Sequence, residues 1–283
     1  MTDRIDNYFA NGAQWLDGSY TDKHSVAVER FELIKYLIQQ IKPQSLLDIG
    51  CGDGRLLKNL DFIKRRVGAD YSEDMLKRAS ADCTEIDYCK LDLNSNLENN
   101  LSSIGKFDLI TMMGVIHYLK NPMLSLSVLC ESLNDGGRMA VSFRNRLFNI
   151  FPKSKYSLSE LTVTNYPHLV AEANFWLGFD PHSSALLEQV TNDNFGCKLL
   201  NEVRMQNCLE GVTDPEWNVD SFEHWRQFTP LEAILLFDRV GLTAEAIYAL
   251  HCEGVYHQNI DKNINAPCHL PMSTSFVVIG RMA

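Results

Sequence analysis

The fold of this chain is decided by residues 46–55, which read LLDIGCGDGR. The aliphatic residues at the start of this stretch predict a short buried strand. Gly50, Gly52 and Gly54 follow at alternate positions, and a turn rich in glycine lets a ligand approach the backbone closely. Leucines within residues 56–60 predict a helix directly after the turn. We therefore expect the N–H groups of the turn and the N-terminus of the helix to face one point and to bind a nucleotide-like ligand there.

The spacing of the glycines disfavours a dinucleotide as that ligand. A dinucleotide fingerprint has a third glycine three residues after the second, and Arg55 stands at that position here. Asp48 precedes the first glycine by two residues, and its carboxylate would repel a pyrophosphate. The same carboxylate suits a ligand that carries an ammonium group and a sulfonium group.

Three later segments have the pattern of further strands, two of them followed by an acid. Residues 67–72 read VGADYS and place Asp70 at the end of a second strand. Residues 88–93 read YCKLDL and place Asp92 after a third strand. Residues 107–117 read FDLITMMGVIH, a nearly continuous apolar run that is typical of a strand buried on both faces.

These four segments, in this order and at these intervals, resemble the motifs of the class I S-adenosylmethionine-dependent methyltransferases. The resemblance implies S-adenosyl-L-methionine as the cofactor and an α/β fold with a seven-stranded, doubly wound, Rossmann-like sheet. It also implies that Asp48 orients the ammonium group of the cofactor, that Asp70 holds the ribose and that Tyr71 packs on the adenine. The residues implied to bind the cofactor are Tyr20, Asp48, Gly50, Cys51, Gly52, Gly54, Asp70, Tyr71, Asp92, Leu93 and Met113. Two of these have an equally good alternative, because Tyr20 could anchor an N-terminal helix and Asp92 could be an ordinary loop residue.

The stretch 144–228 interrupts the alternation of strands and helices. It follows the fifth predicted strand, is too long for a structureless loop and is rich in Phe and Trp. Ligands of open α/β sheets bind beyond the carboxyl ends of the strands, so we expect a substrate cap over the site. The alternatives are a structural elaboration or a homodimer interface. The predicted domains are a core of residues 1–143 and 229–283, in which 1–42 form an N-terminal helical segment, and a cap insertion at 144–228.

His117 is the candidate catalytic residue. It comes directly after the fourth predicted strand, where the resemblance places the methyl group of the cofactor. A hydroxyl acceptor must lose its proton, and a histidine can act as the general base, which predicts a rate that rises through a pKa near neutrality. The alternative is a histidine that only holds the end of the strand.

Positive charge is concentrated after the fifth strand. Arg144 and Arg146 are followed closely by Lys153 and Lys155, with no acid among them. We therefore predict that Arg144 and Arg146 bind an anionic methyl acceptor. The alternative is a solvated basic segment with no ligand.

Composition excludes several classes of function. A formal charge of −10 and a sequence pI of about 5.3 disfavour a nucleic-acid partner. The 8 cysteines have no metal-ligand spacing, so we expect no metal and reduced thiols. The beginning of the chain lacks the pattern of a signal peptide, and no apolar run is long enough for a membrane span, which predicts a cytoplasmic protein.

The sequence therefore predicts an enzyme that transfers a methyl group from S-adenosylmethionine to a small molecule. The acceptor atom is expected to be a hydroxyl oxygen of an anionic biosynthetic metabolite. Three alternatives remain open at this point: a small-molecule N-methyltransferase, a protein methyltransferase, and a non-catalytic regulatory module that binds the cofactor.

Overall fold

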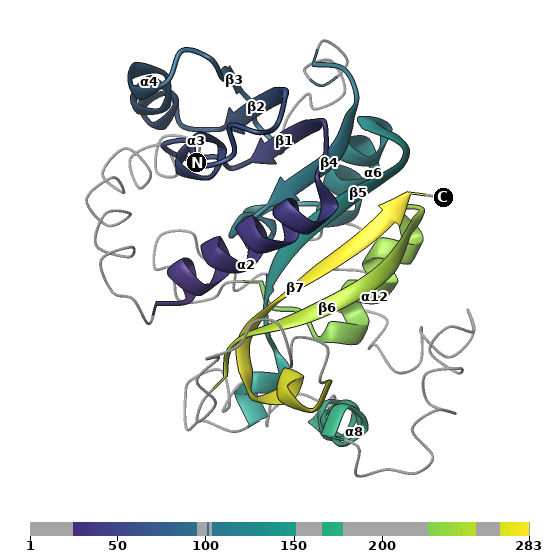
Figure 1. The fold of residues 1–283 in the computed structure, drawn as a ribbon. Coiled ribbons are helices and arrows are strands. Elements are labelled where there is room, and N and C mark those ends of the chain that lie inside the picture. The colour runs from purple at the N-terminus through teal and green to yellow at the C-terminus, as the bar shows by residue number, and fades with distance from the viewer. Residues whose placement is uncertain are drawn as a thin grey trace.

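The protein forms a seven-stranded mixed sheet with the strand order β3-β2-β1-β4-β5-β7-β6 in a computed structural model (Figure 1). The structure describes residues 25–94, 101, 104–150, 166–177, 226–252 and 267–282. The strands are β1 (Ser45–Ile49), β2 (Arg65–Asp70), β3 (Asp87–Lys90), β4 (Phe107–Met112), β5 (Leu133–Arg144), β6 (Leu242–Cys252) and β7 (Ser273–Met282). β1 to β5 are parallel to one another, and β7 pairs antiparallel with both β5 and β6. The predicted seven-stranded, doubly wound, Rossmann-like sheet is confirmed.

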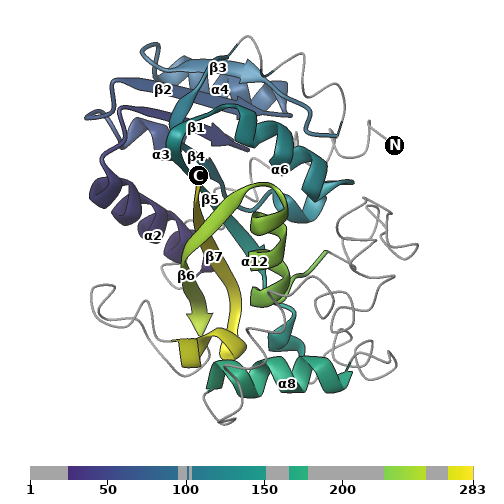
Figure 2. The same cartoon turned by 90° about the vertical axis from the view of Figure 1, so that its right-hand side faces the viewer.

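Helices cover both faces of this sheet. The described helices are α2 (Val26–Ile41), α3 (Arg55–Lys58), α4 (Glu73–Asp82), α6 (Pro122–Glu131), α8 (Tyr166–Leu177) and α12 (Pro230–Arg239), and the described 3-10 helices are η1 (Ile116–Tyr118), η2 (Leu147–Ile150) and η3 (Pro267–Met272). Figure 2 shows α2 on one side of the sheet and α6 and α12 on the other.

Local sequence signals explain where the main helices begin. The side chain of Ser25 caps α2, and that of Asn121 caps α6, whose first residue is Pro122. Thr229 and Glu232 form a complete capping box at the start of α12. These caps fix the helices that pack on the sheet.

The core consists of two apolar layers, one on each face of the sheet. On the first face, Leu33, Leu37 and neighbouring residues of α2 pack against Leu46 and Val277 of the sheet. On the other face, the residues of α6 and α12 pack against the opposite side chains of the same strands, which include Ile110, Val141 and Val278. Both faces of the central strands are therefore buried, which explains their continuous apolar sequences.

The predicted insertion leaves the sheet and returns to it at one place. The N–H of Phe228 donates to the carbonyl of Arg144 at 3.0 Å, and the N–H of Arg146 donates to the carbonyl of Phe228 at 2.9 Å. Between these ends, the structure describes η2 and α8, and α8 lies against η3. The rest of the stretch 144–228 lies outside the described residues, so its role as a cap stays a prediction, as do the domain boundaries and the homodimer.

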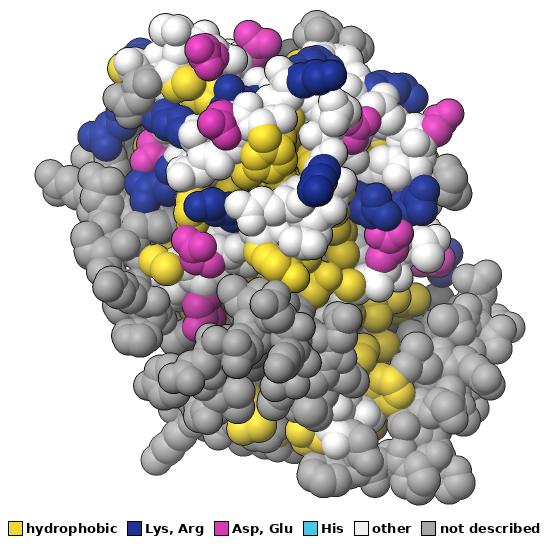
Figure 3. Space-filling view, in the orientation of Figure 1, with side chains coloured by type: hydrophobic (Ala, Val, Ile, Leu, Met, Phe, Trp, Pro, Cys, Tyr) yellow, Lys and Arg dark blue, Asp and Glu magenta, His cyan; other side chains and the backbone are white. Residues whose placement is uncertain are grey.

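Two observations concern the surface of the molecule. On the face in Figure 3, basic and acidic side chains are interspersed over the described residues, with apolar side chains between them. Among the helices of the described ranges, none has the length and apolar character that a membrane span requires. The predicted cytoplasmic location stays a prediction.

Candidate functional site

The glycine turn requires its glycines. Gly50, Gly52 and Gly54 all have a positive φ, of 73°, 55° and 74°. A Cβ added at Gly50 would lie 2.2 Å from Cγ2 of Val115, and one at Gly54 would lie 2.4 Å from Oη of Tyr88. Side chains at these positions would thus clash with the loop after β4 and with β3, in addition to straining the backbone.

The N–H groups of the turn are used within the protein. Those of Gly50 and Cys51 both donate to the carbonyl of Ala69, at 2.7 and 3.1 Å, and that of Gly52 donates to Oδ2 of Asp70 at 2.8 Å. The expectation that these groups face the ligand is therefore wrong. They bind the turn to β2, because the turn runs beside the end of that strand.

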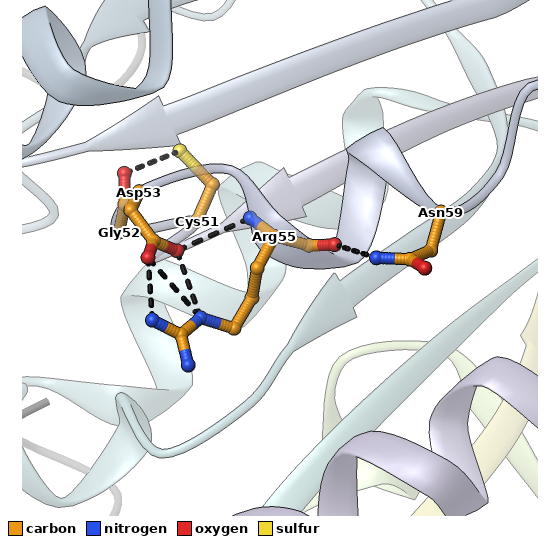
Figure 4. A network of polar contacts seen from close by, with 5 residues as sticks. All are labelled: Cys51, Gly52, Asp53, Arg55 and Asn59. Carbon is orange, nitrogen blue, oxygen red and sulfur yellow. Dashed lines mark hydrogen bonds and ion pairs between the residues drawn. The ribbon is translucent and has the colours of Figure 1, made fainter. Parts of the chain in front are cut away.

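The short helix after the turn begins beside an acid (Figure 4). Asp53 accepts from the N–H of Arg55 at 3.2 Å and pairs with its guanidinium at 2.5 Å. Burial alone would raise the pKa of Asp53, but the hydrogen bonds and charge of Arg55 lower it overall. A carboxylate at the start of α3, which has only 4 residues, leaves no phosphate site there.

Asp70 joins the turn to the start of α4. Its Oδ1 accepts from the N–H of Ser72 at 2.8 Å, while Oδ2 holds Gly52. Burial raises the pKa of Asp70, and these backbone hydrogen bonds oppose the increase. A carboxylate can accept about four hydrogen bonds, so Asp70 retains capacity for a ligand hydroxyl. Tyr71 follows directly and is half-buried.

Asp48 is a buried acid at the end of β1. Its side chain is 4% exposed, and its Oδ1 accepts from Thr111 Oγ1 at 2.7 Å. Burial raises the pKa of Asp48 to about 7; the hydrogen bond from Thr111 opposes this increase and the charge of Asp70 adds to it. Thr111 was not among the residues predicted from the sequence, where its only signal was a polar residue in the apolar strand β4.

Two further predicted residues follow β3. Asp92 accepts from the N–H of Asn94 at 2.8 Å, which closes a local turn. Leu93 is half-buried, and its carbonyl accepts from Ser125 Oγ at 3.1 Å. Met113, directly after β4, packs against the apolar layer beneath α2.

The donors and acceptors around the turn fit S-adenosylmethionine. The two acids Asp48 and Asp70 lie close enough for the charge of one to affect the other, at the carboxyl ends of β1 and β2. Carboxylates beside a turn in which the N–H groups of Gly50, Cys51 and Gly52 are already used suit a ligand with a cationic group and hydroxyls. S-adenosylmethionine carries an ammonium, a sulfonium and a ribose, whereas Asp48 and Asp70 would repel a pyrophosphate.

His117 lies in η1, at the carboxyl end of β4. It is 6% exposed, and its ring packs against that of Tyr118 with 4.1 Å between centroids. Burial lowers the pKa of His117 well below its ordinary value, and the positive charges of Arg144 and Arg30 lower it further. The imidazole is therefore neutral at physiological pH, and the predicted pKa near neutrality is corrected to a lower one.

Arg30 is a site residue that was not predicted from the sequence. It lies on α2, and a Cβ added at Gly114 would be 3.1 Å from its Nη2. The signal was available, because Arg30 is spaced by four residues from the buried Ile34 and Ile38 and so shares their face of the helix.

The two arginines after β5 lie in different surroundings. Arg144 is half-buried and near His117. Arg146 is 2% exposed, and its Nη1 pairs with Oε1 of Glu232 at 3.3 Å. This pairing with the capping glutamate of α12 does not favour the predicted role of Arg146 in binding an acceptor.

Some predicted features lie outside the described residues. Tyr20 is one of them, as are the side chains of the other histidines of the C-terminal half, His168, His182, His224, His251, His257 and His269. Within the described ranges, no group of three or more His, Cys, Asp and Glu could hold a metal ion.

Known proteins resemble this chain in sequence and in fold. A family model described as a methyltransferase domain matches residues 47–139. Ubiquinone biosynthesis O-methyltransferase from Hydrogenovibrio crunogenus is 25% identical over 154 residues, or 52% of this chain and 62% of the relative. The enzyme of the same name from Parvibaculum lavamentivorans is 28% identical over 157 residues, or 50% of this chain and 62% of the relative. The chain thus spans less than two thirds of the length of these two relatives.

Solved structures agree with the fold. Magnesium protoporphyrin IX methyltransferase from Synechocystis, with bound S-adenosylhomocysteine, has a TM-score of 0.54 at 13% identity and covers 99% of this chain and 98% of its own. An S-adenosylmethionine-dependent methyltransferase from Thermotoga maritima has a TM-score of 0.52 at 14% identity and covers 100% of both chains. With the glycine turn and its acids, these findings identify residues 47–139 as a methyltransferase domain of the class I, S-adenosylmethionine-dependent type, with S-adenosylmethionine as its cofactor, in a chain that has the fold of such proteins.

Proposed function

We propose that this protein transfers a methyl group to a hydroxyl oxygen of a small-molecule acceptor, with His117 as the general base. The observation that carries the proposal is a buried, neutral imidazole beside two arginines, at the carboxyl ends of β4 and β5. The O-methyltransferase names of the relatives support oxygen as the acceptor atom. When bound, the cofactor supplies a methyl group on a positively charged sulfur.

We assign the binding of the cofactor to the two acids and their surroundings. Asp48 would face the ammonium group, and Asp70 would accept hydrogen bonds from the ribose. Tyr71, Asp92 and Leu93 would frame the adenine. The support for these roles is the position of each residue at the carboxyl edge of β1, β2 or β3 and the fit of two carboxylates to a cationic ligand.

His117 would take the proton of the acceptor hydroxyl on an imidazole nitrogen as the oxygen attacks. A lowered pKa ensures that the imidazole is unprotonated but also makes it a weak base. The proton transfer is then favourable only if the developing negative charge on the oxygen is stabilised. Arg30 and Arg144 supply positive charge at this point, which also disfavours an acceptor that arrives as a cationic amine.

The test combines an activity screen with a His117 variant. The full-length protein is incubated with S-adenosylmethionine that carries a labelled methyl group and with a metabolite extract, and labelled products are identified by mass spectrometry. For the acceptor found, His117→Gln should lower kcat by about 10²- to 10⁴-fold and leave the Kd of S-adenosylhomocysteine unchanged. Labelled products that carry the methyl on nitrogen, or a variant with normal kcat, would contradict the proposal. Binding of the cofactor without any labelled product would favour a regulatory module.

A further inference from the structure

The structure assigns a second polar subsite next to His117, on the α2 side of β5 and β7, and we propose that Arg144 and Ser275 hold a carboxylate group of the methyl acceptor there. The inference rests on the proposed function, because it concerns the substrate of the same site. It adds the chemical class of the acceptor, a carboxylic acid, and a residue that determines specificity, Ser275.

Strand pairing brings the two residues together. Arg144 and Ser275 are direct partners in the antiparallel ladder of β5 and β7. Side chains of directly opposed residues lie on the same face of a sheet, with Cβ atoms about 5 Å apart. Side chains along a strand alternate between the two faces of the sheet, so Ser275, Val277 and Ile279 of β7 lie on the same face. Val277 and Ile279 both pack in the layer beneath α2. Arg144 and Ser275 therefore share the face of the sheet that α2 covers.

The hydroxyl of Ser275 is buried without a hydrogen-bond partner among the described residues. The side chain is 6% exposed, and its Oγ is one of few such atoms found there. Burial of an unpaired hydroxyl is unfavourable, and a ligand oxygen would restore the missing hydrogen bond. The serine on the same face of β5 differs, since Oγ of Ser142 accepts from the N–H of Gly114 at 2.7 Å.

Positive charge lies beside this hydroxyl, on Arg144. The charges of Arg144 and of Arg30, which comes from α2, both act on His117, so the subsite adjoins the proposed general base. A guanidinium presents paired N–H donors that match the two oxygens of a carboxylate, and a serine hydroxyl adds a third donor. An acceptor bound by its carboxylate here would have its hydroxyl held near His117.

Calorimetry on the full-length protein saturated with S-adenosylhomocysteine tests the subsite, with benzoate, benzamide and phenyl phosphate as probes. Benzoate should bind at least about tenfold more tightly than the neutral benzamide, because only benzoate can pair with a guanidinium. Arg144→Gln should remove this difference, and Ser275→Ala should weaken benzoate by about fivefold. The matched control is Thr274→Val, because Thr274 Oγ1 is also buried without a partner but belongs to the opposite face of β7.

Several results would overturn the subsite. One is equal binding of benzoate and benzamide, or no binding of benzoate up to its solubility limit. Tighter binding of phenyl phosphate than of benzoate would make the anion a phosphate. A loss of S-adenosylhomocysteine affinity in Arg144→Gln would mean that the arginine binds the cofactor instead. If the protein prefers benzoate to benzamide but methylates no hydroxyl, the proposed function is refuted and the subsite stands. If the protein methylates neutral acceptors and shows no preference for benzoate, the subsite is refuted and the proposed function stands.

Discussion

Thr111 donates a hydrogen bond of 2.7 Å to Asp48, and the two residues are direct neighbours in the parallel ladder of β1 and β4. The hydrogen bond keeps the carboxylate oriented in a place where burial raises its pKa to about 7. Asp48 is therefore close to its titration point under physiological conditions. A cationic ligand would favour the charged form, so the protein carries an acid that is unfavourable for folding and favourable for binding.

Replacement of Asp48 by Asn should stabilise the free protein at high pH. The folded pKa of about 7 lies above the ordinary 3.8 of an aspartate, so the stability linked to the protonated acid is present below pH 3.8 and is lost as the pH rises through 7. We expect Asp48→Asn to raise the Tm by about 5 °C at pH 8 and to change it little near pH 4. Thermal unfolding at both pH values tests this. An equal or lower Tm of the variant at pH 8 would show that the carboxylate is not unfavourable.

The affinity for S-adenosylmethionine should fall in acid for the same reason. Below its pKa of about 7, Asp48 must lose a proton before it can pair with an ammonium group. The affinity should therefore decrease by about tenfold for each pH unit below the pKa. Calorimetric titration with S-adenosylhomocysteine across this range, with Asp48→Asn as the control, separates Asp48 from other titrating groups. The variant should bind weakly at all pH values, and a parent protein with a flat profile would remove Asp48 from the cofactor site.

The sequence could predict those site residues whose position depends on a single segment of the chain. The glycine turn, Asp48 and Asp70 follow from local spacing at the ends of strands. Spacing could place Arg30 on the buried face of its helix, but neither its approach to the site nor that of Ser275 could be predicted in this way, because α2 packing and the β5–β7 register bring the two residues there from distant parts of the chain.

The same limit explains two expectations about polar groups that local sequence could not settle. The N–H groups of the glycine turn donate to β2, and this depends on the pairing of β1 with β2. The guanidinium of Arg146 pairs with Glu232, which is far along the chain and reaches it only through the packing of α12. Local charge patterns do not reveal such partners, so Arg144 and Arg146 looked equivalent in the sequence.

Arg146 should stabilise the folded protein. Both it and Glu232 are only 3% exposed in their side chains, so removal of the arginine leaves a buried carboxylate without its cation. We expect Arg146→Ala to lower the free energy of unfolding by about 3 to 5 kcal/mol, as for other broken buried ion pairs. Urea denaturation measures this loss. Arg146→Met combined with Glu232→Gln should recover much of it, and Arg144→Gln is the matched control with a small effect. A stable Arg146→Ala protein with a higher KM for its acceptor would instead support the role predicted from sequence.

The glycine turn should tolerate no side chain at Gly50, for two separable reasons. Its φ is 73°, and a Cβ would lie 2.2 Å from Cγ2 of Val115. The backbone strain for a residue with a Cβ in this region amounts to about 1 kcal/mol, and the steric overlap adds to it. Gly50→Ala should therefore lower both the stability and the affinity for S-adenosylhomocysteine, because the displaced loop carries the chain from β4 toward His117.

Val115→Ala removes the clashing methyl group, so the double variant Gly50→Ala, Val115→Ala should regain the steric part of the lost stability and retain only the backbone strain. Urea denaturation and calorimetry on the parent, both single variants and the double variant give this coupling directly. Additive effects of the two substitutions would mean that Val115 does not contact the turn, and they would contradict the close approach of the loop to Gly50.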